Sequence, residues 1–66
     1  MKNDLKVERA KKDITQATLA EKIGVSRQSI NAIEKGKFIP STLLALKMAR
    51  YFETAVGDIF ELEEGE

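Results

Sequence analysis

A chain of 66 residues predicts one small domain, because a chain of this length buries only about 60% of its unfolded surface and cannot support two cores. It contains no cysteine and no histidine, which argues against disulfides and metal sites, so no metal and no cofactor is expected. No apolar run approaches the roughly 18 residues of a membrane helix, and the first residues are too polar for a signal peptide. We therefore expect a single cytoplasmic domain over residues 1–66.

The formal net charge of zero hides an uneven distribution of charge. Residues 1–50 carry all eleven Lys and Arg residues against five acidic ones, which gives +6, and residues 51–66 carry six acidic residues, which gives −6. A basic body can steer a protein toward nucleic acid. The pattern fits equally well an ordinary solvated surface with a solubilising tail, so charge alone leaves both interpretations open.

The first predicted helix covers residues 4–12, with Asn3 or Asp4 as its N-cap. Its outward side is strongly charged. Ile14 follows the helix and is expected to point back to the core.

Two short helical patterns joined by a tight turn come next. Residues 16–23 follow the N-cap residue Thr15, and Gly24 suits a helix end in the left-handed conformation. Residues 27–35 follow the N-cap residue Ser26. The apolar residues of both patterns share an inward side and are expected in the core: Leu19, Ala20, Ile23, Ile30 and Ile33.

Gly36 ends the third predicted helix and begins an extended loop. Pro40 excludes helix at the preceding residue, and Phe38 and Ile39 are expected to pin the loop to the core. Residues 42–52 then predict a fourth helix that is apolar around more than half its circumference, and hence central.

A last short helix is predicted over residues 56–60, with Val56, Ile59 and Phe60 as apolar anchors. Gly57 costs about 1 kcal/mol inside a helix, so this element should be short and easily frayed. The sequence thus predicts an all-α fold, a compact five-helix bundle. A short strand pairing of the two termini is compatible with it.

Catalysis finds no support in the sequence, so we expect no enzyme. The chain lacks histidine, cysteine and a glycine-rich phosphate loop, and it is too small to enclose a substrate easily. The paired carboxylates near the end are sequence neighbours on an exposed segment, which does not favour acid–base chemistry.

The helices at 16–23 and 27–35 favour DNA recognition instead. Two helices that cross steeply about a glycine-containing turn can place the start of the second helix in a major groove. Arg27 would lead that helix, where arginine can bind a guanine edge, and Gln28 and Asn31 can match the donor and acceptor of adenine. Gln16 begins the preceding helix, where free amides suit a phosphate oxygen.

The stretch from Thr15 to Lys37 resembles the Cro/phage-repressor-like (Xre) helix-turn-helix family, in its small single-domain form. The matching residues are Thr15-Gln16, Leu19-Ala20, Ile23-Gly24-Val25-Ser26, Gln28, Ile30, Ile33-Glu34 and Gly36-Lys37. The resemblance extends weakly over the whole chain, including Pro40-Ser41 and Asp58-Ile59-Phe60. Departures occur at Glu8, at Glu53 in place of a helix-ending glycine, and at Ala55 with Gly57.

The resemblance implies a lambda-repressor-like DNA-binding domain that binds a near-palindromic operator as a homodimer and regulates transcription, as a repressor, in the nucleoid. The expected base contacts are Arg27, Gln28, Asn31 and Ala32. The expected contacts to the DNA backbone are Gln16, Thr15, Ser26, Lys35, Lys37, Ser41 and Thr42. Arg9 and Glu34 are expected to form a structural ion pair, and the expected dimer interface consists of Val56, Ile59, Phe60 and Leu62.

Two alternatives stay open. The same fold could serve as an antitoxin or adaptor that binds a protein partner through its apolar and acidic end. The chain could also be a control protein of a restriction-modification system, which would still be a DNA-binding protein.

Overall fold

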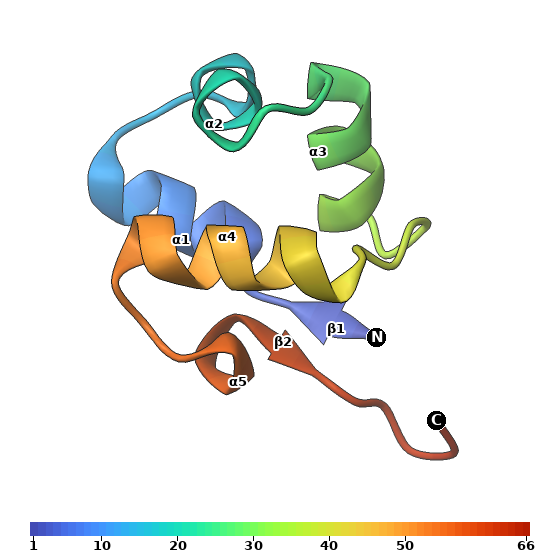
Figure 1. Ribbon diagram of the computed structural model, residues 1–66. Coiled ribbons are helices and arrows are strands. Elements are labelled where there is room, and N and C mark those ends of the chain that lie inside the picture. The colour runs from blue at the N-terminus through green and yellow to red at the C-terminus, as the bar shows by residue number, and fades with distance from the viewer.

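The computed structural model describes residues 1–66 and confirms a helical bundle closed by a small pair of terminal strands (Figure 1). The elements in chain order are β1 Lys2–Asn3, α1 Leu5–Lys12, α2 Gln16–Ile23, α3 Arg27–Glu34, α4 Thr42–Phe52, α5 Val56–Ile59 and β2 Phe60–Glu61. All five predicted helices are present, and the bounds of α2 and α4 match the predicted ones. No helix combines the length and the apolar character needed to span a membrane.

Side-chain oxygen atoms fix the starts of four helices. Thr15, Ser26 and Ser41 each accept a hydrogen bond from the amide three residues later, at 3.0 to 3.2 Å. These contacts satisfy amides that have no partner inside the helix. At α1 the acceptor is Asn3 Oδ1, 3.2 Å from the Leu5 amide, whereas the Asp4 side chain forms no capping bond.

The ends of the helices depend on residues in the left-handed conformation. Gly24 ends α2 at φ +85° and Gly36 follows α3 at φ +74°, as their sequence positions predict. Asp13 and Glu53 end α1 and α4 with φ of 54° and 55°, although neither is a glycine. The helix α3 stops at Glu34, one residue before the predicted end, and Lys35 is its cap.

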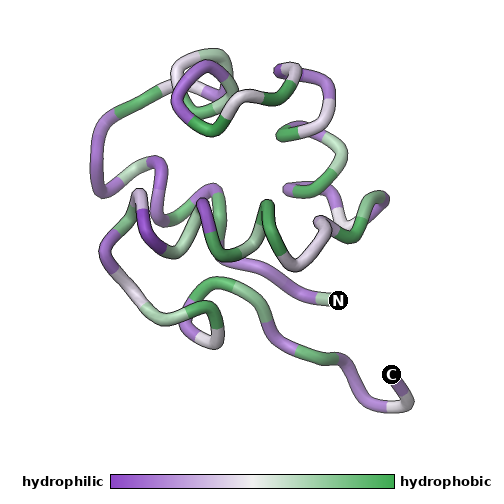
Figure 2. Tube along the Cα trace, in the orientation of Figure 1, coloured by the Kyte–Doolittle hydropathy of each residue, from purple (hydrophilic) through white to green (hydrophobic).

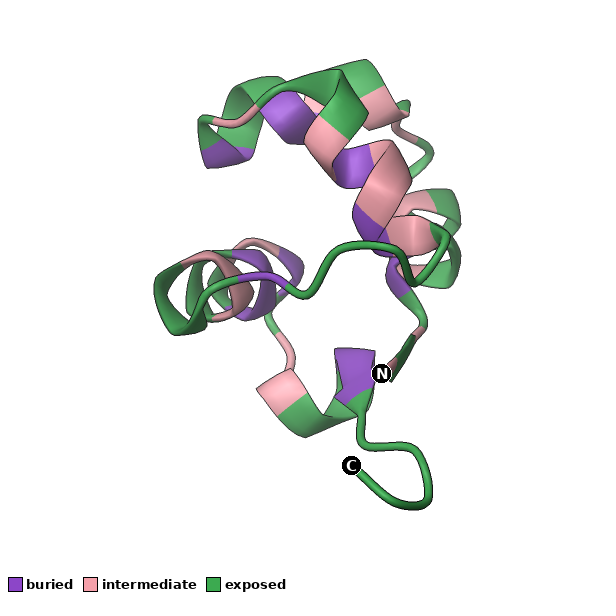
Figure 3. Ribbon diagram, turned by 90° about the vertical axis from the view of Figure 1, so that its right-hand side faces the viewer, coloured by how far each residue is buried: buried purple, intermediate pink, exposed green.

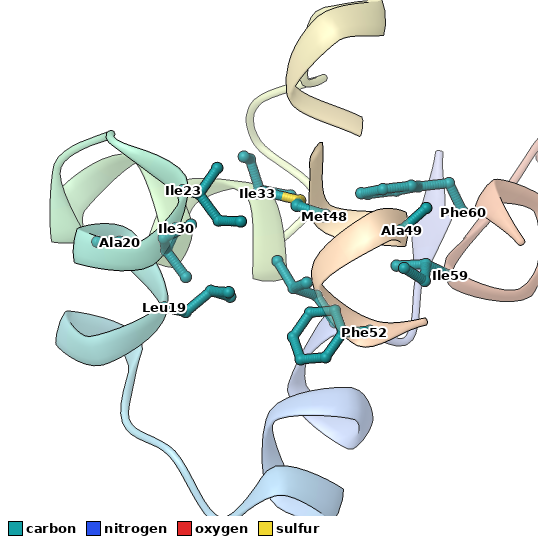
Figure 4. Close-up of a cluster of buried hydrophobic side chains, with 11 residues drawn as sticks. Leu19, Ala20, Ile23, Ile30, Ile33, Met48, Ala49, Phe52, Ile59 and Phe60 are labelled. Carbon is teal, nitrogen blue, oxygen red and sulfur yellow. The ribbon is translucent and has the colours of Figure 1, made fainter. Parts of the chain in front are cut away.

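The core lies where α2, α3 and α4 meet and continues to α5 (Figure 4). Figure 4 shows the side chains of α2 and α3 facing those of α4, with Met48 between Ile33 and Ala49. The buried apolar residues are Leu5, Leu19, Ala20, Ile23, Ile30, Ile33, Met48, Ala49, Phe52, Ile59 and Phe60. Ile14 packs against this cluster, as expected.

The two termini meet in an antiparallel pair in which Lys2 lies opposite Glu61 and Asn3 opposite Phe60. The Met1 amino group continues this contact with ion pairs to Glu63 at 3.3 Å and Glu66 at 2.9 Å. The acidic end of the chain therefore folds back onto the N-terminus.

The predicted role of the loop after α3 is wrong. Phe38 and Ile39 are 48% and 62% exposed, and the buried residue of the loop is Pro40. The geometry that precedes a proline keeps Ile39 extended, but the prolyl ring takes the inward position. The fourth helix is also less enclosed than predicted, because Leu43 and Leu46 are 65% and 54% exposed.

Some of the hydrophobic residues of the bundle are therefore exposed on its surface and not buried in its core. Figure 2 shows strongly hydrophobic stretches in α4 and in the α5–β2 segment, and Figure 3 shows exposed turns on the outer sides of the helices. An apolar surface remains exposed around α4, which bears on how the chain associates.

Candidate nucleic-acid interface

The outer side of α3 presents the residues that the sequence assigned to base contact. Arg27 and Gln28 are exposed and make no hydrogen bond or ion pair within the chain, whereas Asn31 and Ala32 are half-buried. Arg27 stands in the first turn, where the positive end of the helix dipole makes a cation unfavourable without an anion nearby. These four residues are called the reading edge below.

A part-buried ion pair joins α1 to α3, as predicted for Arg9 and Glu34. Arg9 Nε lies 2.5 Å from Glu34 Oε2, and the second guanidinium contact, to Oε1, is 3.0 Å. Arg9 also donates to the carbonyl oxygen of Ile14 at 3.1 Å. The side chains of Arg9 and Glu34 are only 14% and 7% exposed, so the pair joins α1 firmly to the end of α3.

The pKa values of this pair shift in the directions that a stable ion pair requires. Burial works to raise the pKa of Glu34, but hydrogen bonds from Arg9 and Gln16 and the charges of Arg9 and Lys6 outweigh it and lower that pKa. The hydrogen bond to Glu34 raises the pKa of Arg9. Both groups therefore stay charged at neutral pH.

Gln16 extends this network to the reading edge. Its amide nitrogen lies 3.1 Å from Glu34 Oε1 and 3.3 Å from Asn31 Oδ1. Asn31 thus uses one of the two acceptor positions of its amide oxygen within the chain, and its second acceptor position and its amide hydrogens have no partner there. The sequence treated Gln16 and Asn31 as separate contacts, whereas the structure brings them together.

Three of the four hydroxyl groups assigned to DNA backbone contact, those of Thr15, Ser26 and Ser41, cap helices. Thr15 accepts from the Thr18 amide and also lies 3.1 Å from the Thr18 hydroxyl group, and the Ser26 hydroxyl lies 3.0 Å from that of Ser29. Ser41 caps α4. The remaining side chains of this set are exposed and make no ion pair: Lys35, Lys37 and Thr42.

Sequence reasoning missed one residue that supports the site. Asn3 Nδ2 donates to the carbonyl oxygen of Ile33 at 2.8 Å, which fastens β1 to the end of α3. The two residues are thirty positions apart, so no local pattern could have indicated the contact. The sequence predicted Asn3 only as a possible N-cap of the first helix.

The residues expected at a dimer interface fall into two groups. Ile59 and Phe60 are 2% and 7% exposed and belong to the core of the single chain, so they offer almost no surface to a second one. Leu62 is 68% exposed, and Val56 is half-buried. Val56 and Phe60 line a hollow of about 210 Å³ together with Ile39 and Leu46.

A helix-turn-helix family model matches residues 5–59, which include the reading edge and its supporting network. The chain belongs to the helix-turn-helix family. An uncharacterized helix-turn-helix-type transcriptional regulator of Methanocaldococcus jannaschii is 54% identical over 66 residues, and the match covers all of both chains. One of Bacillus subtilis is 48% identical over 64 residues, with 97% of each chain covered.

A solved structure supports the same membership. The solution structure of the SOS-response transcriptional repressor LexA from Eubacterium rectale superposes with a TM-score of 0.81 at 33% identity, over 96% of this chain and 67% of that one. The chain is thus a DNA-binding helix-turn-helix protein of the transcriptional regulator family, which confirms the expectation that it is not an enzyme.

Proposed function

We propose that this helix-turn-helix regulator binds a near-palindromic operator as a homodimer, with α3 in the major groove, and represses transcription in the cytoplasm at the nucleoid. The observation that carries the proposal is the contrast within α3. Its first turn exposes Arg27 and Gln28 without internal partners, while its last turn is held by the Arg9–Glu34 pair. A rigid helix that presents free donors is suited to base recognition.

Arg27 and Gln28 are the proposed readers of base edges. The guanidinium group can donate two hydrogen bonds to guanine, and the carboxamide can donate to and accept from adenine. Phosphates would also relieve the unfavourable position of Arg27 at a positive helix end. Ala32 is small and half-buried, so its methyl group suits contact with thymine.

Gln16 and Asn31 have a proposed joint role. Because Gln16 binds Glu34 and Asn31 through its amide nitrogen, its position at the start of α2 is fixed relative to α3. The start of α2 is then poised for a phosphate, and Asn31 both supports Gln16 and can still bind DNA through its amide group. Lys35, Lys37 and Thr42 are exposed and complete the proposed backbone contacts.

The proposed homodimer uses the apolar hollow beside α4 and α5. Exposed Ile39 and Leu46 and half-buried Val56 line this hollow, and Met1 and Pro40 close it. A two-fold axis there would bury side chains that a single chain leaves in water. Among the residues first assigned to the interface, Val56 and Leu62 keep that role in the proposal, while Ile59 and Phe60 support them from the core.

A protein-binding role as antitoxin or adaptor is the second candidate, because the same exposed apolar surface could accept a different polypeptide. The dependence of DNA binding on salt separates the two functions. Neutralising several phosphates releases counterions, so operator affinity should fall steeply as salt rises. A response to salt that is flat would favour the protein partner.

The proposed function is tested with Arg27→Ala on operator duplexes selected from random DNA. Loss of a bidentate base contact should reduce specific affinity by ~1–3 kcal/mol and relax the preference at one base position. Lys11→Ala is the control, since Lys11 is exposed and pairs only with Glu8. Fluorescence anisotropy that gives the same affinity for Arg27→Ala and the parent protein would contradict the assignment.

A further inference from the structure

A second basic surface lies away from the reading edge. A cleft of about 600 Å³ is lined by the last turns of α1, α2 and α4, and its charged residues are Lys12, Lys22, Lys47, Arg50 and Glu53. Four cations against one carboxylate give a charge of +3. The four cations are all exposed and none of them makes an ion pair within the chain. This group of five residues and Tyr51 is called the basic cleft.

The basic cleft and the reading edge lie on different sides of the molecule. Figure 1 shows the C-terminal ends of α1 and α4 at the left and α3 at the right. Three of the four cations, Lys12, Lys47 and Arg50, belong to α1 and α4, whereas Lys22 lies near the end of α2, which a short turn joins to α3. No residue of the reading edge lines the cleft, so the two surfaces consist of different residues.

A purely structural role explains only part of this charge. Lys12, Lys22 and Arg50 lie in the last turns of their helices, where cations offset the negative end of the dipole. Lys47 lies one turn earlier and has no such role. The acidic end of the chain does not neutralise the cleft either, because Glu63 and Glu66 pair with the Met1 amino group.

The form of the cleft indicates the class of anion. Helix C-terminal ends present carbonyl oxygens, so no free backbone amides point into the cleft to enclose a small anion. The cations instead extend on long, exposed side chains, and Lys12 Nζ lies 5.1 Å from the centre of the Tyr51 ring. Charged groups at the ends of long side chains around the edge of the cleft can each contact a different phosphate along a nucleic-acid backbone.

We propose that the basic cleft binds the phosphate backbone of a second DNA duplex, without sequence preference, while the reading edge holds the operator. This rests on the proposed function for the role of the reading edge. The chain then has two DNA surfaces of different character. One reads bases and the other attracts phosphates, so one molecule can hold two duplex segments together.

The test measures the binding of a labelled duplex of scrambled sequence to full-length Arg27→Ala/Gln28→Ala, in which the reading edge is already disabled. Adding Lys47→Gln/Arg50→Gln should weaken the remaining binding about tenfold at about 50 mM salt and reduce the slope of affinity against salt by about 2. Adding Lys2→Gln/Lys11→Gln, which removes the same charge outside the cleft, should change it less than about twofold. Circular dichroism and sedimentation check that fold and assembly are unchanged.

Two results would overturn the proposal. One is an equal loss in both pairs of variants, which general electrostatic attraction would explain, or no loss in either pair, which would mean that the cleft does not take part in the binding. The other is an NMR titration in which tripolyphosphate, but not the scrambled duplex, shifts the Tyr51 signals, because that marks a small-anion site. Arg27 and Gln28 are replaced in all of these variants, so failure of operator recognition is seen separately in the Arg27→Ala experiment.

Discussion

At the scale of single residues, side chains that seem independent in the sequence act as one network. Glu34 accepts hydrogen bonds from both Arg9 and Gln16, and Gln16 reaches Asn31. The Arg9–Glu34 pair therefore fixes Gln16, the first residue of α2, and also α3, which ends at Glu34. Removal of Glu34 would disturb the stability of the fold and the placement of the site together.

The pH dependence of stability tests the role of Glu34. Its folded-state pKa lies below the ordinary value, so its stabilising contribution is present above about pH 4.3 and is lost as pH falls through the lower folded value. Glu34→Gln should cost about 1–3 kcal/mol near neutral pH, and its difference from the parent protein should shrink on acidification. Chemical denaturation at several pH values measures this difference.

Glu21→Gln provides the control, because Glu21 is exposed and unpaired. Its effect should be close to zero at every pH. A Glu34→Gln penalty that stays constant down to about pH 3 would show that the loss does not come from the ion pair.

At the scale of elements, the sequence predicted the helices well and the packing of the connections less well. Capping residues and glycine mark local geometry, which explains why the bounds of α2 and α4 agree. The outward position of Phe38 and Ile39, the exposure of Leu46 and the contact from Asn3 to α3 depend on partners distant in the chain. Hydrophobic character alone could not assign them.

The same reasoning applies to the candidate site. Arg27 and Gln28 are exposed at the start of α3, as their helical spacing predicted, and the Arg9–Glu34 pair was available from the resemblance. The contact of Gln16 with Asn31 joins two helices and was not available from either pattern.

The end of α4 offers a test of backbone strain. Glu53 adopts φ 55°, where a side chain costs about 1–2 kcal/mol, while hydrogen bonds from Glu53 and Thr54 amides to Arg50 and Ala49 hold the turn. Glu53→Gly should therefore stabilise the fold by about 1 kcal/mol and raise the melting temperature by roughly 4–8 °C. Thermal unfolding followed by circular dichroism measures the change.

Glu53→Ala is the matched variant, because it removes the carboxylate but keeps the Cβ atom. No stabilisation is expected from it. An equal gain in both variants would assign the effect to charge in the basic cleft and not to backbone strain.

At the scale of the whole molecule, three surfaces of different character share a chain of 66 residues. The reading edge lies on α3. The basic cleft lies toward the C-terminal ends of α1 and α4, and the apolar hollow lies beside α5. The hydrogen bond to Glu66 raises the pKa of the Met1 amino group. The hydrogen bond from the Glu63 amide, followed by the one from the Met1 amino group, lowers the pKa of Glu66. The acidic end therefore makes its ion pairs with the Met1 amino group, and Arg27, Lys35 and Lys37 make none.

The apolar hollow is tested through the state of association. Leu46 is 54% exposed and lines the hollow, so Leu46→Glu should leave the fold intact and place a charge in the proposed dimer interface. Sedimentation at tens of micromolar should show dimers for the parent protein and monomers for the variant. Val7→Glu, at a residue 51% exposed on α1, should remain dimeric. Dimers in all three proteins would place the interface elsewhere.

Selection of bound sequences from random duplex DNA tests the central claim most directly, since it reports base recognition and symmetry in one measurement. Two copies of α3 in successive major grooves should enrich a near-palindromic sequence whose half-sites lie about one helical turn, roughly 34 Å, apart. Recovery of no preferred sequence, or of a single half-site without symmetry, would contradict the account of a dimer that reads DNA through Arg27 and Gln28.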